Sequence, residues 1–477
     1  MPQHSLEYYN LMPFIVLAAG ILLTISIEMF YSKSKDLIPY VSLAVYLIVA
    51  ITSVYNINNH FIVFGGMLET GGKAGFMNIL FSLGAIVVTL SSIHYLEKYG
   101  TYFGEYHILV QLSVLGMMVM AGSKDLFMVF MGLELMSISF YVLVGMNRKR
   151  ISANESSMKY FLLGSFATGF IVYGIALIYG IAETTNIEVI INKFNVLSAN
   201  VIFVLGMFLF IIGFSFKIAA FPFHSWVPDV YQGSSTTITG LMSSIGKTAA
   251  FSVIFIMLTS IFVGDSPNLF RTYFSIISAF SMLFGSIVAI SQKNIKRMLA
   301  YSSISHAGYI SIGLASGNSD ALAGMMFYLF AYSFMNLGAF GIISILENEN
   351  EGNLEIADYA GLSKTHPFLA GLLALFLISL TGIPPLAGFF GKYYVFISAI
   401  ESNLIWLVFV GILSSIISSY FYLRPIVFMY FKEYDEPIQA KISLPSIIAV
   451  SFSAFIIIIY GIFPNLLLGI IKVTLSF

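Results

Sequence analysis

Apolar stretches long enough to cross a membrane recur along the whole chain and limit what it can fold into. A transmembrane helix needs about 20 apolar residues to cross the roughly 30 Å of the hydrocarbon core. About fourteen such stretches lie at 11–31, 37–57, 75–96, 107–123, 125–146, 158–181, 199–221, 236–262, 272–291, 297–316, 321–346, 367–399, 402–430 and 443–470. The longest hydrophilic segment between them, 347–365, is too short for a soluble domain. We therefore predict an all-α polytopic membrane protein that forms a single transmembrane domain over 1–477.

The composition agrees with this class and excludes several others. Only 9% of the residues are charged and 58% are hydrophobic, whereas soluble domains carry about 25% charged residues. A formal net charge of −1 provides no positive surface for nucleic acid, so we expect membrane lipids and not nucleic acid as partners. The chain has no cysteine, which excludes disulfides, iron–sulfur clusters and thiolate catalysis. No histidine pair is spaced for haem or zinc, so we expect no cofactor or metal in this chain.

Positive charges between the stretches predict the orientation. Cytoplasmic loops of membrane proteins carry an excess of Lys and Arg. The loops after odd-numbered stretches hold twelve of these residues, whereas the loops after even-numbered stretches and the C-terminal tail hold five. We therefore place the odd-numbered loops in the cytoplasm and both termini on the outer side of the membrane.

Prolines interrupt two of the stretches. Pro222 lies at the end of the seventh stretch, and Pro384 and Pro385 lie within the twelfth. Proline cannot donate the helical hydrogen bond, and backbone groups freed at membrane depth are tolerated only where they face protein or a wet cavity. The seventh and twelfth stretches are five apart, so equivalent helices there would cross the membrane in opposite directions. This placement predicts two inverted five-helix repeats, at 107–262 (stretches 4–8) and 272–430 (stretches 9–13).

Four ionisable side chains lie inside the stretches, where apolar side chains would suffice for packing. Glu134 and Lys247 lie near the centres of the fifth and eighth stretches, and Lys217 and Lys392 flank the two proline breaks. A charged side chain at the bilayer centre costs about 2.5–3.5 kcal/mol, so four unpaired ones would cost on the order of 10 kcal/mol. Proton transfer can require such groups, because a lysine in an apolar environment can exchange its proton near neutral pH.

Other titratable side chains lie close to these four. His224 lies beside the first break and His306 lies among serines, and an unperturbed histidine titrates near neutral pH. Both are therefore candidate proton relays. Lys159 closely follows the basic segment 148–150, so we expect its side chain to extend to the membrane interface.

A static ion pair is a second explanation of the buried charges. Glu134 could pair with Lys217 or Lys247 and fix the packing of the helices. This explanation accounts for one pair but leaves Lys392 without an evident carboxylate in its own half of the chain.

Five segments are similar to one known family. They are 132–137, 216–229, 244–247, 292–303 and 382–392, of which 216–229 reads FKIAAFPFHSWVPD and is the most specific. On these segments, which span nearly the whole chain, the sequence resembles the antiporter-like membrane subunits of proton-pumping NADH:quinone oxidoreductase. The resemblance implies fourteen helices, two inverted repeats and conduction of protons from the cytoplasm to the periplasm across a bacterial inner membrane.

Within this family the chain is most similar to the N branch. It is shorter than the members of the M and L branches, Lys392 rather than Glu occupies the twelfth stretch, and no long amphipathic helix follows the last stretch. The resemblance implies that the redox chemistry, with FMN, iron–sulfur clusters and quinone, lies in partner subunits and that this chain has no redox centre of its own. It also implies contacts with the antiporter-like subunit M and the small membrane subunits J and K.

The resemblance also implies roles for individual residues. The family's central charged row is matched by Glu134, Lys217, Lys247 and Lys392, which we call the charged row. Accessory positions of the proton path are matched by Lys159, His224, Asp229 and His306, and we expect His306 to link the two halves of the row. Two other functions fit the same residues: a subunit of a cation/proton antiporter or membrane-bound hydrogenase, and a membrane scaffold whose buried charges only fix helix packing.

Overall fold

The first half of the chain forms long helices that run alongside one another. The computed structural model describes residues 9–31, 34–100, 103–262, 268–348, 352–433 and 438–475. Its first long helices are α2 (Met12–Phe30), α3 (Ser34–Asn56), α4 (Gly72–Lys98), α5 (Gly104–Gly122), α6 (Leu126–Val144) and α7 (Ile151–Ala182). The short α8 (Ile187–Asn192) and α9 (Phe194–Leu197) follow. They lead to α10 (Val201–Lys217), α11 (Trp226–Gly233), α12 (Thr236–Leu241), a wider π-helical turn η2 (Met242–Gly246) and α13 (Lys247–Phe262).

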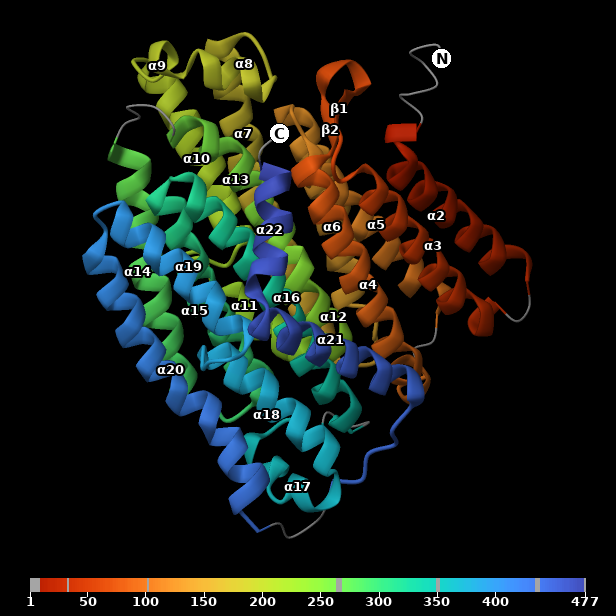
Figure 1. Cartoon of the computed structure of the whole chain (residues 1–477). Helices are drawn as coiled ribbons and strands as arrows, with labels where there is room; N and C mark the ends of the chain where they lie inside the picture. The colour runs from red at the N-terminus through yellow and green to blue at the C-terminus, as the bar shows by residue number, and fades with distance from the viewer. Residues whose placement is uncertain are drawn as a thin grey trace.

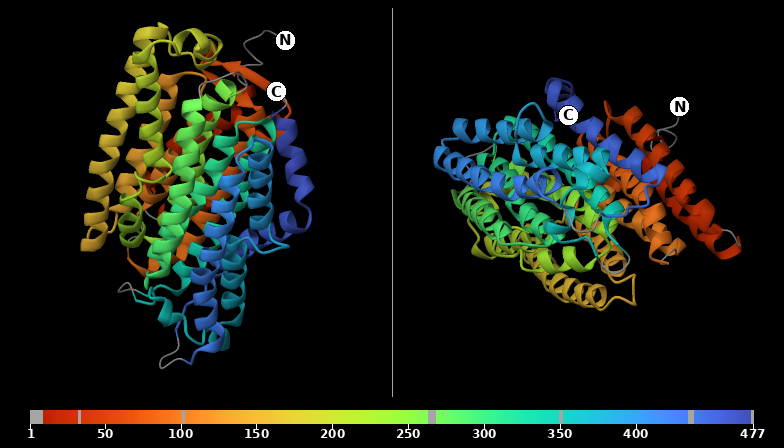
Figure 2. Two further views of the ribbon diagram at one scale, coloured as in Figure 1. Left: turned by 90° about the vertical axis from the view of Figure 1, so that its left-hand side faces the viewer. Right: turned by 90° about the horizontal axis from the view of Figure 1, so that it is seen from below.

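The second half completes an elongated bundle. Its elements are α14 (Asn268–Ile290), α15 (Ile295–Ser316), α16 (Ser319–Leu346), η3 (Ile356–Tyr359), α17 (Leu362–Thr365), α18 (Pro367–Thr381), α19 (Ala387–Glu401), α20 (Ile405–Phe431), α21 (Leu444–Ile462) and α22 (Pro464–Leu475). The helices lie side by side along the long direction of the molecule (Figure 1). Seen from below, α2 and α3 lie at one end of the bundle and α20 lies at the other (Figure 2).

The described helices confirm the predicted all-α membrane protein. Eleven of them are long and apolar enough to cross a membrane. With α15 and the two interrupted helices α10/α11 and α18/α19, they account for the fourteen predicted stretches. The polar side chains of α15, which include Ser302, Ser303, Ser305 and His306, distinguish it from the more apolar spans.

Both predicted helix breaks are present. α10 ends at Lys217 and α11 begins at Trp226, with Pro222 in the connection. α18 ends at Thr381 and α19 begins at Ala387, with Pro384 and Pro385 between them. One interrupted helix therefore lies in each of the segments 107–262 and 272–430, and the inverted relation of these segments stays a prediction.

Two elements differ from the sequence prediction. The last stretch was predicted as one helix over 443–470, but the structure divides it, because Pro464 begins α22 at a position that needs no helical N–H. Between α3 and α4 the chain forms an antiparallel hairpin of β1 (His60–Val63) and β2 (Leu68–Gly71), joined by η1 (Phe64–Gly66). Gly71 allows this hairpin because a side chain there would collide with the Asn59 carbonyl.

Small residues bring together the helices that carry the candidate site. A Cβ on Gly116 of α5 would lie 2.6 Å from the main-chain oxygen of Gly132, so only glycine allows this approach of α6. A Cβ on Gly285 of α14 would lie 2.6 Å from the nitrogen of Ser305 on α15. Close packing through small residues is typical of helices within membranes. Within this bundle, the most apolar part of α16 is completely buried.

Candidate functional site

The three lysines of the charged row are buried. The relative exposed areas of Lys217, Lys247 and Lys392 are 6%, 2% and 5%. Glu134 is partly buried on α6. None of the lysines reaches an interface, so each of the three ammonium groups depends on partners inside the protein.

Lys217 is held by α6, the helix that carries Glu134. Its Nζ donates to the Ser137 hydroxyl at 2.9 Å and to the Tyr141 hydroxyl at 3.2 Å. Glu134 lies near enough to act electrostatically on Lys217, while its Oε1 accepts a hydrogen bond of 2.9 Å from Thr168 on α7. Among the described side chains, Glu134 forms no direct ion pair with Lys217 or Lys247, so the static pair considered from the sequence is not present in this structure.

Lys247 crosses from the first half of the chain to the second. It begins α13, directly after the π-helical turn η2. Its Nζ donates to the main-chain oxygen of Ser303 at 2.8 Å and to the Ser303 hydroxyl at 2.5 Å. Ser303 lies on α15, so this contact joins two segments that are 56 residues apart.

His306 lies one helical turn after Ser303 on the same helix. Its Nδ1 is 2.8 Å from the hydroxyl of Tyr328 on α16, and its Nε2 is 2.9 Å from the hydroxyl of Tyr422 on α20. The Tyr422 hydroxyl also bonds to Ser302. Both ring nitrogens therefore contact hydroxyl groups, which can donate or accept a proton.

Lys392, the last residue of the charged row, lies on α19. Its Nζ donates to the main-chain oxygen of Thr381 at 2.7 Å and to the Ser415 hydroxyl at 2.9 Å. It also lies 4.5 Å from the ring centre of Tyr309, a residue one turn beyond His306 on α15. A Cβ on Gly382 would come within 2.9 Å of the Lys392 side chain, so the glycine leaves room for the lysine.

Ser303, His306 and Tyr309 follow one another at every third position of α15. Residues three apart lie on the same side of a helix. They therefore form one buried polar face between Lys247 and Lys392. This is the place between the two halves where the sequence led us to expect His306.

Two of the accessory residues, Lys159 and Asp229, lie outside this face. Lys159 is 43% exposed and pairs with Asp229 at 2.8 Å and with Glu155 at 2.7 Å. Arg297 holds the other oxygen of Asp229 at 2.7 Å. Together these residues form a partly exposed ion cluster that links α7, α11 and α15.

His224 occupies an aromatic environment beside the first helix break. Its ring lies 4.5 Å from that of Phe284 and 5.4 Å from that of Phe221. Its Nδ1 is buried and has no hydrogen-bond partner among the described atoms. These contacts do not join His224 to the polar face of α15.

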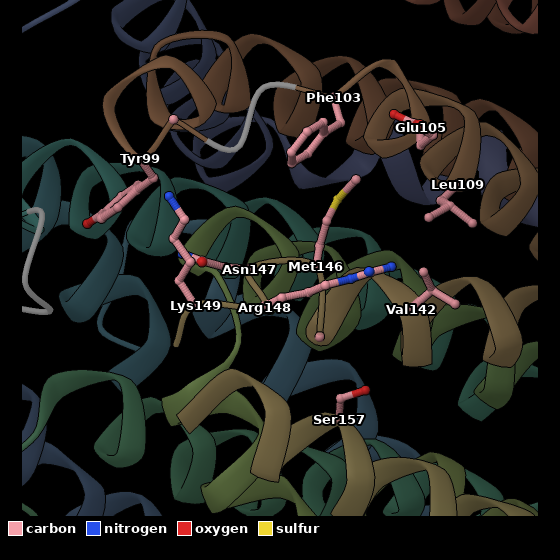
Figure 3. A pocket seen from close by; sticks show the side chains of 12 residues that line it. Tyr99, Phe103, Glu105, Leu109, Val142, Met146, Asn147, Arg148, Lys149 and Ser157 are labelled. Atoms are coloured by element: carbon pink, nitrogen blue, oxygen red, sulfur yellow. The ribbon is translucent and has the colours of Figure 1, made fainter. Parts of the chain in front are cut away.

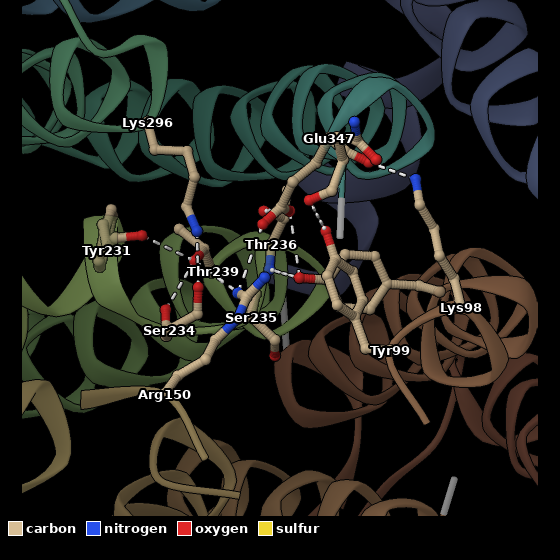
Figure 4. Close-up of polar contacts among 12 residues, drawn as sticks. Lys98, Tyr99, Arg150, Tyr231, Ser234, Ser235, Thr236, Thr239, Lys296 and Glu347 are labelled. Carbon is tan, nitrogen blue, oxygen red and sulfur yellow. Dashed lines mark hydrogen bonds and ion pairs between the residues drawn. The ribbon is translucent and has the colours of Figure 1, made fainter. Parts of the chain in front are cut away.

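The sequence analysis missed a second buried polar cluster. Glu347 at the end of α16 contacts Tyr95, Arg150 and Thr236 (Figure 4). We had assigned Glu347 to the start of the hydrophilic segment 347–365. In the sequence, the apolar stretch 321–346 leads directly to Glu347. Hydropathy does not distinguish a helix that ends inside the protein from one that ends in water.

One surface cavity is lined by none of the residues of the charged row. It has a volume of about 660 Å³ and opens at the surface where α5, α6 and the start of α7 meet. Tyr99, Met146, Asn147 and Arg148 line it (Figure 3). Within the described residues, no group of three or more His, Asp or Glu side chains is arranged to hold a metal ion.

Comparisons with known proteins identify the family. The family described as NADH:quinone oxidoreductase/Mrp antiporter, TM, matches residues 123–418. The NADH-quinone oxidoreductase subunit N of Trichlorobacter lovleyi is 40% identical over 465 residues, which cover 96% of this chain and 95% of that one. This chain belongs to the subunit N family. A subunit N of Chloroherpeton thalassium is 38% identical over 99% of both chains. Family membership makes the chain a membrane subunit of an NADH-quinone oxidoreductase.

Solved structures share the fold. A chain of respiratory complex I from Thermus thermophilus has a TM-score of 0.82 at 27% identity, over 96% of this chain and 98% of that one. A chain of an archaeal membrane-bound sulfane sulfur reductase has a TM-score of 0.87 at 24% identity, over 98% of this chain and 97% of that one. The second likeness concerns the fold alone. The subunit N fold is therefore common to several membrane complexes.

Proposed function

We propose that this subunit N conducts protons from the cytoplasm to the periplasm along the charged row. The observation that carries the proposal is the buried polar face of α15, on which Ser303, His306 and Tyr309 lie between Lys247 and Lys392. Lys247 bonds to Ser303 at one end of this face and Lys392 lies against Tyr309 at the other, and the membrane environment disfavours such buried charges. The proposal explains why these groups are present where apolar side chains would pack.

Hydroxyl and imidazole groups suit a proton relay. A lysine ammonium can only donate, whereas a hydroxyl both donates and accepts. The Ser303 hydroxyl can accept from Lys247 and pass a proton toward His306, which lies between two tyrosine hydroxyls. Histidine carries one proton on either ring nitrogen and can therefore take one on one side and release one on the other.

Glu134 provides electrostatic control at the start of the row. A carboxylate near a lysine favours the charged form of the lysine. Movement or protonation of Glu134 would therefore weaken the hold of Lys217 on its proton. Since Lys217 bonds to Ser137 and Tyr141 and not directly to Glu134, the lysine keeps its place when this influence changes.

The energy for transport comes from partner subunits in this proposal. NADH oxidation and quinone reduction, with FMN and iron–sulfur clusters, would take place there. We propose the antiporter-like subunit M and the small membrane subunits J and K as neighbours. The bacterial inner membrane is the proposed location, with both termini on the periplasmic side, as the excess of Lys and Arg in the odd-numbered loops supports.

Two alternatives make different predictions. An antiporter or hydrogenase subunit would share the fold, but full-length identities near 40% to oxidoreductase subunits N favour the oxidoreductase. A scaffold would need only the packing of the helices. It predicts that an apolar side chain in place of Lys247 preserves activity, because well-packed apolar residues often replace buried charges without loss.

The proposed function is tested by Lys247→Met in the assembled oxidoreductase. In inverted membrane vesicles we expect normal assembly and a loss of NADH-driven proton pumping of about tenfold or more, in line with the roughly 10²–10⁴-fold effect of removing a positioned proton-transfer group. Lys193→Met, which removes an exposed lysine, is the matched control. Normal pumping by an assembled Lys247→Met complex would establish the scaffold instead.

A further inference from the structure

A fully buried carboxylate lies outside the charged row. Oε2 of Glu347 accepts hydrogen bonds from the Thr236 hydroxyl at 2.5 Å and from the Tyr95 hydroxyl at 3.1 Å. Oε1 lies 3.5 Å from Nη1 of Arg150, and the main-chain oxygen of Glu347 accepts from Lys98. These contacts join the ends of α4, α7, α12 and α16 (Figure 4).

Stability alone does not explain this cluster. The Glu347 side chain is 0% exposed and that of Arg150 is 13% exposed. Burying an ion pair removes hydration that the mutual attraction often does not replace, and apolar side chains can substitute without loss of stability. A carboxylate in this position therefore points to a role that uses its charge or its ability to hold a proton.

Two neighbouring cavities lie between Glu347's partners and the surface. The surface cavity of about 660 Å³ and a smaller one of about 20 Å³ share Tyr99, Met146 and Asn147 as lining residues. The smaller cavity is also lined by Arg150, which contacts Glu347, and by Ser235, the residue before Thr236. A polar cavity of roughly 10–15 Å³ or more has room for a water molecule. The smaller cavity therefore has room for one water molecule beside Arg150 and Tyr95, which both contact the carboxylate.

Several hydroxyl side chains lie along the helical segment between Thr236 and Lys247. Lys247 lies eleven residues after Thr236, a distance of about 16 Å along a helix that rises 1.5 Å per residue. The buried residues between them include Thr237, Ser243 and Ser244. Thr237 also borders a third cavity of about 10 Å³, near the lower limit for one water molecule.

We propose that Glu347 is the proton-accepting group of an uptake route that leads from the surface cavity to Lys247. Tyr95 lines the small cavity and donates to the carboxylate, so its hydroxyl can give a proton to Glu347 and take one from water in the cavity, and the Thr236 hydroxyl can pass the proton on. The inference rests on the proposed function, since it supplies the protons that the charged row conducts. It adds Glu347, Thr236 and the cavities to that function.

A mechanical lock is the competing role of the same contacts. Glu347 could simply hold the end of α12 against α16 and so keep Lys247 in place. A lock needs hydrogen bonds to Thr236, which a glutamine at position 347 can still accept. Proton uptake needs a carboxylate, so an isosteric amide separates the two roles.

The deciding experiment compares Glu347→Gln with Glu347→Asp in the assembled oxidoreductase in inverted membrane vesicles. We expect Glu347→Gln to lower the rate of NADH-driven reduction of a soluble quinone analogue about tenfold or more. We expect Glu347→Asp to stay within about threefold of the wild type, because it keeps a carboxylate. Added formate, a small weak acid that can carry protons into the surface cavity, should restore a measurable part of the Glu347→Gln rate.

Glu355→Gln is the matched control, because it removes an exposed carboxylate from the same loop. It should leave the rate unchanged. A wild-type rate for Glu347→Gln, or a loss that is shared by Glu347→Asp and not restored by formate, would overturn the uptake route. Lys247→Met measured in parallel separates the two proposals: a defect there with a normal Glu347→Gln rejects only the uptake route, whereas normal rates in both reject the proposed function as well.

Discussion

The two interrupted helices hold their lysines in different ways. Lys217 is the last residue of α10, before its break, and its hydrogen bonds go to side chains of α6. Lys392 follows its break, and one of its bonds goes to the main-chain oxygen of Thr381, the last residue of α18. The carbonyl groups at a helix end have no partner within the helix. In the second half of the chain, the break itself therefore supplies an acceptor for the lysine.

At the first break, a main-chain oxygen near the end of α10 has other partners than the lysine. The main-chain oxygen of Phe216 accepts hydrogen bonds from the indole of Trp226 at 3.1 Å and from the N–H of Ala219 at 3.0 Å, so it is not available to Lys217. Lys217 is left with two hydroxyl partners and the nearby carboxylate of Glu134. Of these two lysines, the first therefore lies near a carboxylate, whereas the second is held by a main-chain oxygen.

The largest effect is expected from removing the lysine that the backbone holds. Lys392→Met removes a titratable group from the row and takes the lysine donor from the Ser415 hydroxyl and from the Thr381 oxygen, which still accepts from Ser415 at 3.2 Å. We expect NADH-driven proton pumping in inverted vesicles to fall about tenfold or more. Lys432→Met, at an exposed position, is the control. Unchanged pumping would mean that the second half of the row carries no protons.

Glu134→Gln tests the control by a neighbouring charge. The amide can keep a hydrogen bond with Thr168 but loses the charge that acts on Lys217. We expect a several-fold loss of pumping, about threefold to tenfold, because the transfer groups themselves remain. Glu401→Gln, which removes an exposed carboxylate at the end of α19, should pump normally. Equal rates for the two variants would contradict a special role for Glu134.

Removing hydroxyl partners should affect the two lysines unequally. The double variant Ser137→Ala with Tyr141→Phe removes the hydrogen bonds of Lys217 to these two hydroxyls, each worth about 1.5–3 kcal/mol for a charged group. Ser415→Ala leaves Lys392 its bond to Thr381. We therefore expect a clear loss of pumping in the first variant and a change below about twofold in the second, since only one partner is lost there. Equal losses would remove the distinction between side-chain and backbone support.

The smallest effect on pumping is expected from removing the indole donor to the main-chain oxygen of Phe216 at the first break. Trp226→Phe keeps an aromatic ring near Phe216 and Tyr160 but removes the indole donor. We expect a loss of stability of about 0.5–1.5 kcal/mol, because the Phe216 oxygen loses one hydrogen bond but keeps the one from the Ala219 N–H. The unfolding temperature of the solubilised complex should fall while pumping stays close to normal. A large pumping defect with unchanged stability would show that this carbonyl belongs to the path.

The sequence predicted the bundle well because its signals are local. The length of an apolar stretch decides whether a helix can cross the membrane, and Pro222, Pro384 and Pro385 identify both breaks. The hairpin between α3 and α4 and the division of the last stretch at Pro464 were not predicted. The hairpin depends on the pairing of two strands, which hydropathy does not show. The division of the last stretch depends on the single residue Pro464, which hydropathy also does not show.

The sequence by itself determined that charged side chains lie at membrane depth beside two broken helices. Only the tertiary structure decided which of them meet. Lys247 finds Ser303 across 56 residues, Lys217 finds Ser137 across 80, and Glu347 is buried although it follows the last residue of its helix. Length and hydropathy act on neighbouring residues and can be read along the chain, whereas the partners of a buried charge depend on how separate helices pack.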